Sequence, residues 1–260
     1  MTNKEALVLQ ESPGDGIVLL RLNRPEVRNA LNLTLRHQLA ALFKDLSFRD
    51  EVRCIVITGN ETAFCAGADL REYVDASPID VIGRNMRALW GAIADCPKPV
   101  IAAVNGYAIG GGCELAMHAD IIVAGHSAKF GQPEIRIGLI PGGGATQRLT
   151  RVAGKFVTMK LLLTGEIISA AEAQALGLVS SLVADDQVLA EALKLAQEIA
   201  RQAPLSARLI KEAVLESMNG SLDAGLRSEL KSFQLVFASS DKKEGIQAFL
   251  EKRTPQFVGR

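Results

Sequence analysis

Short runs of β-branched and other apolar residues recur through the first two-thirds of the chain. Glycine, proline or asparagine bounds each run, which is typical of buried strands. These predicted strands cover 16–22, 53–59, 99–106 and 120–125. Helix-like segments separate them, among them one over 79–94 and one that places leucines at helical spacing between 35 and 46. Such alternation of strands and helices predicts an α/β core with mainly parallel strands.

The pattern changes after about Gly154. A short helix, a glycine stop and one more strand are predicted over 170–183. From Gln187 the chain is predicted to be helical almost to its end, over 187–202, 206–218, 222–238 and 241–251. We therefore expect an α/β core over 1–190 and a helical C-terminal section over 191–260.

Composition narrows the possible functions. Hydrophobic residues make up 48% of the 260 residues, which is enough to bury a core and excludes wholesale disorder. Lys+Arg and Asp+Glu each number 29, so the zero net charge gives no electrostatic reason to expect nucleic acid or an anionic membrane as a partner. The four cysteines are scattered and the three histidines lack metal-ligand spacing, so we expect reduced thiols and no metal site.

The N-terminal stretch "MTNKEALVLQESPGDG" lacks the charged start and apolar segment of a signal peptide. No run of about 18 uninterrupted apolar residues suggests a transmembrane helix. We therefore expect a cytoplasmic protein that does not enter a membrane.

Three consecutive glycines, 110–112, interrupt an apolar run, and Glu114 follows them. In one interpretation they only allow a tight strand-to-helix turn, and the helix dipole favours a glutamate in the first helical turn. In the other, the turn leaves backbone N–H groups unpaired at a helix N-terminus, where they stabilise negative charge on a bound carbonyl oxygen. The segment alone leaves both interpretations open.

Two other segments have the same ambiguity. The segment "FCAGADL" (64–70) also leads from a strand to a probable helix, and an ordinary loop with Asp69 as N-cap would account for it. Glu134 follows a proline in an apolar setting, where an ion pair with Arg136 or Arg148 would give it a purely structural role.

The order and spacing of these segments resemble the enoyl-CoA hydratase/isomerase (crotonase) superfamily, and enoyl-CoA hydratases in particular. The matching segments cover nearly the whole chain. They are "LNRPEVRNALN" (22–32), "FCAGADL" (64–70), "KPVIAAVNGYAIGGGCELAMHADI" (98–121), "FGQPEIRIGLIPGGGATQRL" (130–149), "LLLTGEIISAAEAQALGLV" (161–179) and "KKEGIQAFLEKRTPQF" (242–257). The resemblance implies a crotonase-like spiral of ββα turns whose C-terminal helices drive assembly into a homotrimer or a dimer of trimers.

The resemblance also implies a site. The backbone N–H groups of Ala66 and Gly111 correspond to an oxyanion hole, and Glu114 and Glu134 to two catalytic glutamates. No separate cofactor is implied, because the coenzyme A thioester is the substrate. The residues it places along that substrate are Arg28, Ala30, Ala66, Gly67, Ala68, Asp69, Leu70, Gly111, Phe249 and Lys252.

The implied reaction is hydration of a trans-2-enoyl-CoA to a 3-hydroxyacyl-CoA. By resemblance, Glu114 is the base toward water and Glu134 the proton donor to the α-carbon. Glu134 must then have a raised pKa, for which the apolar residues Ile135, Ile137 and Leu139 offer a cause. Cys65 and Cys113 border this site, but no histidine in a suitable motif lies near enough in sequence to activate them.

Two alternative functions and the identity of the acyl chain remain open at this stage. A Δ3,Δ2-enoyl-CoA isomerase of the same superfamily needs a single carboxylate, whereas the chain has two. An RNA-binding protein of this fold would need a lysine-rich helix, but the helix at 34–50 has only Arg36, Lys44 and Arg49 as cations. The tail resembles hydratases of both fatty-acid and phenylacetate-type catabolism, so the acyl chain stays open.

Overall fold

The computed structural model describes residues 6–260. These residues form two sheets, and the larger one contains the four strands predicted over 16–22, 53–59, 99–106 and 120–125. Residues 1–5, part of the N-terminal stretch interpreted above, lie outside the described residues. The strand order of this sheet is β1-β2-β3-β5-β7-β10, antiparallel between β1 and β2 and parallel elsewhere. Its strands are β1 (Val8–Gly14), β2 (Ile17–Leu22), β3 (Cys54–Thr58), β5 (Val100–Val104), β7 (Ile121–Gly125) and β10 (Ser181–Val183). Unbroken apolar runs such as β3 and β5 suit a parallel sheet that is covered on both faces.

A smaller sheet has the order β4-β6-β8-β9. It contains β4 (Ala63–Cys65), β6 (Tyr107–Ile109), β8 (Lys129–Gly131) and β9 (Ile167–Ser169). Consecutive strands form pairs in which the first strand lies in the larger sheet and the second in the smaller one, and a helix follows each pair. These pairs are β3 and β4, β5 and β6, and β7 and β8. This is the expected spiral of ββα turns. The sequence did not predict these strands, because three residues are too few to show a periodic pattern.

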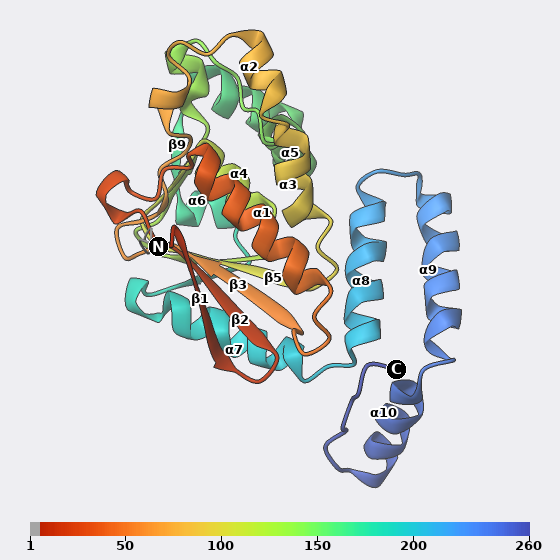
Figure 1. Ribbon diagram of the computed structural model, residues 1–260. Helices are drawn as coiled ribbons and strands as arrows, with labels where there is room; N and C mark the ends of the chain where they lie inside the picture. The colour runs from red at the N-terminus through yellow and green to blue at the C-terminus, as the bar shows by residue number, and fades with distance from the viewer. Residues whose placement is uncertain (1–5) are drawn as a thin grey trace.

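Helices cover the sheets on both sides (Figure 1). Those of the spiral are α1 (Leu33–Ser47), α2 (Pro78–Gly83), α3 (Met86–Ala94), α4 (Gly111–Met117), α5 (Ala145–Thr164) and α6 (Ala170–Ala175). The side chain of Asn32 caps α1 by accepting from the Leu35 N–H at 2.8 Å. The single helix predicted over 79–94 is divided at Asn85, which takes a left-handed conformation that asparagine tolerates (φ 46°). Short 3₁₀ turns link the larger elements: η1 (Pro25–Val27), η2 (Leu70–Glu72), η3 (Pro133–Ile137) and η4 (Asp185–Gln187).

Helix α7 (Val188–Ala200) covers one face of the larger sheet. Its fully or nearly buried residues recur every four positions at Val188, Ala192, Ala196 and Ala200, and three of them are alanines that allow the helix to approach the strands. The boundary predicted at residue 190 therefore falls within a helix of the core. The section that stands away from the core begins with α8.

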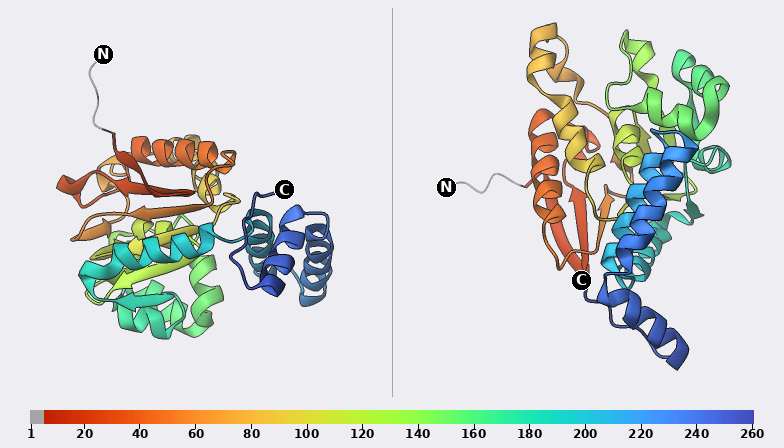
Figure 2. Two further views of the ribbon diagram at one scale, coloured as in Figure 1. Left: turned by 90° about the horizontal axis from the view of Figure 1, so that it is seen from below. Right: turned by 90° about the vertical axis from the view of Figure 1, so that its right-hand side faces the viewer.

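The C-terminal helices stand to one side of the core (Figures 1 and 2). They are α8 (Pro204–Ser217), α9 (Leu222–Val236) and α10 (Ser240–Glu251). Lys211 on α8 holds this section to the core by an ion pair with Asp120 at 2.7 Å. The apolar face of α9 is exposed over Leu226, Leu230, Phe233 and Phe237. No helix of residues 6–260 is both long and apolar enough to cross a bilayer.

Candidate active site

The glycines at 110–112 lie where β6 turns into α4. Gly110 has a positive φ of 51°, and a Cβ there would lie 2.6 Å from Oε1 of Glu134. A Cβ on Gly112 would overlap the carbonyl oxygen of Cys65 at the end of β4. These glycines therefore allow two close approaches at once, one to a carboxylate and one to the neighbouring strand.

Glu114 is buried in the first turn of α4, with 3% of its surface exposed. Its Oε1 accepts from the N–H groups of Gly143 at 2.6 Å and Ala145 at 3.1 Å. Burial raises the pKa of Glu114, but the two backbone donors and the cations of Arg36 and Arg148 oppose that rise. This carboxylate is held in one place by groups that favour its ionised form.

Glu134 lies in η3 and is partly buried. Burial raises its pKa to about 7, and the charge of Glu114 adds to the rise. Its Oε1 lies 2.6 Å from the position of a Cβ on Gly110, the N-cap of the helix that carries Glu114, so both carboxylates lie at the turn into α4. With its amide oriented to donate, Gln132 lies 3.2 Å from both oxygens of Glu134. Glu134 can thus carry a proton near neutral pH.

The predicted rise in the pKa of Glu134 is confirmed, but its apolar surroundings and the alternative of a structural ion pair need comment. Ile135, Ile137 and Leu139, which were offered as a cause of this rise, are themselves 42%, 52% and 42% exposed. Neither arginine proposed as an ion-pair partner contacts it within residues 6–260: Arg136 donates to the Thr164 carbonyl and Arg148 to that of Met117. Glu134 therefore lacks the cationic partner that would give it a structural role.

The expectation for the oxyanion hole needs a correction at Ala66. Its N–H donates to the carbonyl oxygen of Arg28 at 2.9 Å, so this donor is already used. The Ala68 N–H has no acceptor among the described residues, and its nitrogen lies 3.5 Å from the position of a Cβ on Gly111. Gly111 is the first residue of α4, so its own N–H has no partner within the helix.

A positive φ of 113° at Gly67 explains the difference between Ala66 and Ala68. It reverses the backbone so that the Gly67 carbonyl accepts from Leu31 at 2.7 Å, while the Asp69 N–H donates to Leu31 at 3.1 Å. The N–H of Ala68, between these two residues, takes no part in the pairing with Leu31. The letters "AGA" do not reveal which alanine presents its amide, because that depends on the conformation of the glycine between them.

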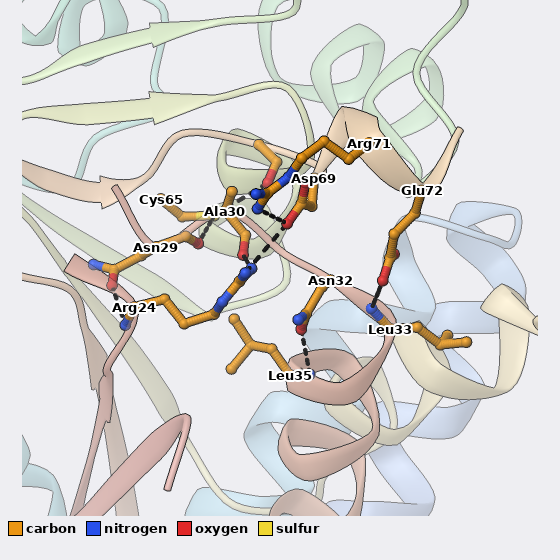
Figure 3. A network of polar contacts seen from close by, with 11 residues as sticks. Arg24, Asn29, Ala30, Asn32, Leu33, Leu35, Cys65, Asp69, Arg71 and Glu72 are labelled. Carbon is orange, nitrogen blue, oxygen red and sulfur yellow. Dashed lines mark hydrogen bonds and ion pairs between the residues drawn. The ribbon is translucent and has the colours of Figure 1, made fainter. Parts of the chain in front are cut away.

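A polar network joins the 24–33 loop to the segment that follows β4 (Figure 3). Arg24, 8% exposed, donates to the Ala30 carbonyl and to the Asp69 carboxylate at 3.2 Å. Arg71 donates twice to Asp69, at 2.8 Å each, and these arginines lower the pKa of Asp69 to about 2. Asp69 thus anchors the two loops rather than capping a helix, since its side chain makes no capping hydrogen bond.

The other residues expected along coenzyme A have different environments. Arg28 is exposed, has a left-handed conformation and lies over the Tyr107 ring at 5.9 Å, while Leu70 is 48% exposed. Phe249 and Lys252 lie on or after α10, which is remote from α4 and η2 in every view (Figures 1 and 2). These two residues therefore do not line the site of their own chain.

The thiols near the site are inert. Burial raises the pKa of Cys65 and of Cys113 to about 12, so neither forms a thiolate near neutral pH. His118 stacks on Trp90 with ring centroids 4.8 Å apart, and burial lowers its pKa to about 4. Among the described residues no group of three or more His, Cys, Asp or Glu side chains is arranged to hold a metal.

Comparison with known proteins places this geometry in a family. The profile of the enoyl-CoA hydratase/isomerase family matches residues 13–260. The chain is 46% identical over 244 residues to the 2,3-dehydroadipyl-CoA hydratase of Escherichia coli, covering 94% of this chain and 96% of that protein. It is 44% identical over 256 residues to a probable enoyl-CoA hydratase of Mycobacterium tuberculosis, with 98% and 99% covered.

Solved structures agree with the sequence relatives. The crystal structure of an enoyl-CoA hydratase from Bacillus anthracis superposes with a TM-score of 0.95 at 36% identity, covering 98% of this chain and all of that one. One from Geobacillus kaustophilus gives a TM-score of 0.94 at 42% identity, with 98% and 99% covered. The chain therefore belongs to the enoyl-CoA hydratase/isomerase family.

Proposed function

We propose that the protein adds water to a trans-2-enoyl-CoA thioester to give a 3-hydroxyacyl-CoA. The observation that carries the proposal is the pair of carboxylates at the turn into α4. Backbone donors and two arginines oppose the rise in the pKa of Glu114, whereas the pKa of Glu134 is raised to about 7. A reaction that takes one proton from water and delivers another to carbon needs a base and an acid at the same time. The names of the relatives at 44–46% identity support the same reaction.

Two backbone N–H groups polarise the thioester carbonyl, which is the first requirement of hydration. The thioester oxygen accepts from the N–H groups of Gly111 and Ala68, so that negative charge builds up on it as the β-carbon is attacked. Each such donor contributes about 10²–10³ in rate, because it is already oriented before charge develops. The α4 N-terminus adds a favourable partial positive charge on the same side.

The carboxylates complete the reaction. Ionised Glu114 accepts a proton from water while the water oxygen bonds to the β-carbon, and protonated Glu134 donates its proton to the α-carbon. The thioester has then gained the elements of water. One proton must pass from Glu114 to Glu134 before the next cycle, which is a short transfer between neighbouring groups.

A single observation favours the isomerase as the second candidate. A carboxyl with a pKa near 7 can both take and return a proton, which is all that moving a double bond between carbons requires. Glu134 alone would serve that reaction. Substitution of each glutamate therefore separates the two candidates.

Glu114→Gln should lower kcat for hydration of crotonyl-CoA by about 10²–10⁴, because the base toward water is lost. It should largely spare the isomerisation of a 3-enoyl-CoA, whereas Glu134→Gln should damage both reactions. The assay follows loss of the conjugated thioester absorbance together with chromatography of the products. Wild-type hydration by Glu114→Gln would contradict the two-carboxylate mechanism and leave the isomerase in its place.

Gly143→Ala should lower kcat/KM by about 10²-fold, because its Cβ would lie 2.7 Å from Oε2 of Glu114 and push the base out of position. The matched control is Gly142→Ala, since no atom lies within 4 Å of a Cβ at that position. Both variants should melt as cooperatively as wild type. Equal activity in the two variants would show that the position of Glu114 is not critical.

We also propose a homotrimer or dimer of trimers. The four large apolar side chains on α9, from Leu226 to Phe237, are 54–59% exposed in the single chain and need a covering surface. A partner subunit would also be needed to bring Phe249 and Lys252 to an acyl-CoA. Sedimentation at micromolar concentration should give three or six subunits, and Leu230→Glu should dissociate them; a wild-type monomer would contradict the proposal.

A further inference from the structure

Arg24 joins the two segments that meet at the proposed oxyanion donor Ala68. It lies between β2 and η1 and is 8% exposed. Its Nη1 donates to the carbonyl oxygen of Ala30, and its Nη2 donates to the carboxylate of Asp69 at 3.2 Å (Figure 3). Ala30 directly precedes Leu31, and Asp69 directly follows Ala68. One buried guanidinium therefore links the residue before Leu31 to the residue after Ala68.

The amide of Ala68 is held in place by its neighbours rather than by a bond of its own. The Leu31 N–H donates to the Gly67 carbonyl at 2.7 Å, and the Leu31 carbonyl accepts from the Asp69 N–H at 3.1 Å. These two hydrogen bonds form an isolated parallel bridge between Leu31 and Ala68, to which only the neighbours of Ala68 contribute bonds. The Ala68 nitrogen lies 3.5 Å from the position of a Cβ on Gly111, the other proposed donor. The register of this bridge therefore sets where the Ala68 N–H lies.

The bridge is too short to fix its own register. A sheet holds its register through several consecutive pairs, whereas this bridge consists of one. Other ties between the two segments lie farther from it: the Ala66 N–H donates to the Arg28 carbonyl at 2.9 Å, and the Glu72 carboxylate accepts from the Leu33 N–H. The guanidinium of Arg24 acts on the residues adjacent to the bridge, so it is placed to stop the two segments from sliding past each other.

The chemistry of arginine suits this task. Its two terminal nitrogens belong to one planar group, so the Ala30 carbonyl and the Asp69 carboxylate are held in a fixed relation. Asp69 is 7% exposed, and removing one member of a buried ion pair leaves the other charge uncompensated. The exposed Arg71 donates twice to the same carboxylate, at 2.8 Å each, but makes no hydrogen bond to residues 24–31. Arg71 thus neutralises Asp69 without joining the two segments.

We propose that Arg24 is a positioning residue for the proposed hydration, which holds the Ala68 N–H where the thioester oxygen accepts from it. The inference rests on the proposed function and adds a group that acts through Ala68 rather than through either glutamate. An oxyanion donor contributes to the rate only when it lies about 3 Å from the oxygen on which charge develops. A displaced bridge should therefore lower kcat, while the binding of the rest of the thioester, and with it KM, changes little.

Arg24→Met tests the proposal at the carbonyl group itself. For hydration of crotonyl-CoA it should lower kcat by about 10- to 100-fold, less than the loss of a whole oxyanion donor, and change KM by less than about threefold. The second readout is the absorbance of bound 4-(dimethylamino)cinnamoyl-CoA, in which an electron-donating amine is conjugated to the thioester carbonyl. Polarisation of that carbonyl by N–H donors moves the absorbance to longer wavelength. Wild type should show this shift at saturating ligand, and Arg24→Met should lose most of it.

Two controls separate the link between the segments from the charge balance at Asp69. Arg71→Met removes the other arginine from the same carboxylate and should keep both the shift and kcat. Arg24→Lys keeps a positive charge beside Asp69, but one nitrogen replaces the two that make the contacts, so it should restore part of each. If Arg24→Met does not melt cooperatively, Asp69→Asn takes its place: it keeps an acceptor for Arg24, weakens the link, and should lower kcat and the shift together.

The absorbance shift distinguishes this inference from the proposed function, because it needs binding but no turnover. A shift that is lost in Arg24→Met and kept in Arg71→Met would support the role of Arg24 even if no thioester were hydrated, in which case only the proposed hydratase function would fail. A full shift in a folded Arg24→Met would overturn that role even in an active hydratase, whatever the kcat or melting temperature of the variant. Loss of the shift in Arg71→Met, or no shift in wild type, would overturn it as well.

Discussion

The close packing of two strand-to-helix turns is the constraint on which the site depends. The N-terminus of α4 rests on the end of β4 so tightly that even a methyl group at Gly112 would overlap the Cys65 carbonyl. This contact brings the free N–H groups of Ala68 and Gly111 together from segments more than forty residues apart in sequence. A buried ion pair between Arg24 and Asp69 holds the neighbouring loop against the same turn.

That packing gives Glu114 and Glu134 different environments. The N–H groups of Gly143 and Ala145 and nearby cations oppose the rise that burial causes in the pKa of Glu114. Glu134 has no ion pair among residues 6–260, and the charge of Glu114 raises its pKa further. In the proposed mechanism, these two carboxyl groups of the same intrinsic acidity serve as base and acid. Glycine at 110 and at 143 provides the space for the two carboxylates, so backbone and side-chain chemistry are coupled at this point.

The sequence predicted the parts of the fold that depend on long apolar patterns. Strands β2, β3, β5 and β7 of the larger sheet were predicted because their apolar runs extend over five or six residues, and the C-terminal helices because their sequence pattern extends over several turns. The three-residue β10 was predicted as the strand after a glycine stop, whereas β1 was not predicted, because it contains no apolar run. The short strands of the smaller sheet, the break at Asn85 and the packing of α7 were not found, because each depends on contacts with distant segments. The resemblance predicted both glutamates, but it could not show that the Ala66 amide is already bonded, since the conformation of Gly67 decides this.

The burial and the partners of charged side chains were the properties least predictable from the sequence. Arg36 read as one of three cations on the helix at 34–50, yet it is buried, which leaves that helix still poorer in exposed positive charge for binding RNA. Asp69 was predicted as a helix cap or as a coenzyme A contact; its side chain makes no cap, and its carboxylate pairs with two arginines. In both cases the polar residue type was evident, but its partners come from segments that only the folded chain brings together.

The central claim of the proposed mechanism is that the Glu134 carboxyl group still holds a proton near pH 7. Infrared difference spectra of the assembled protein across pH 4–9 measure this directly, through the C=O stretch of a protonated carboxyl group. The account predicts a carboxyl that titrates near pH 7, is absent in Glu134→Gln, and shifts to lower pH in Glu114→Gln because the neighbouring charge is removed. A wild-type spectrum whose carboxyl signals have all vanished by pH 5.5 would contradict it.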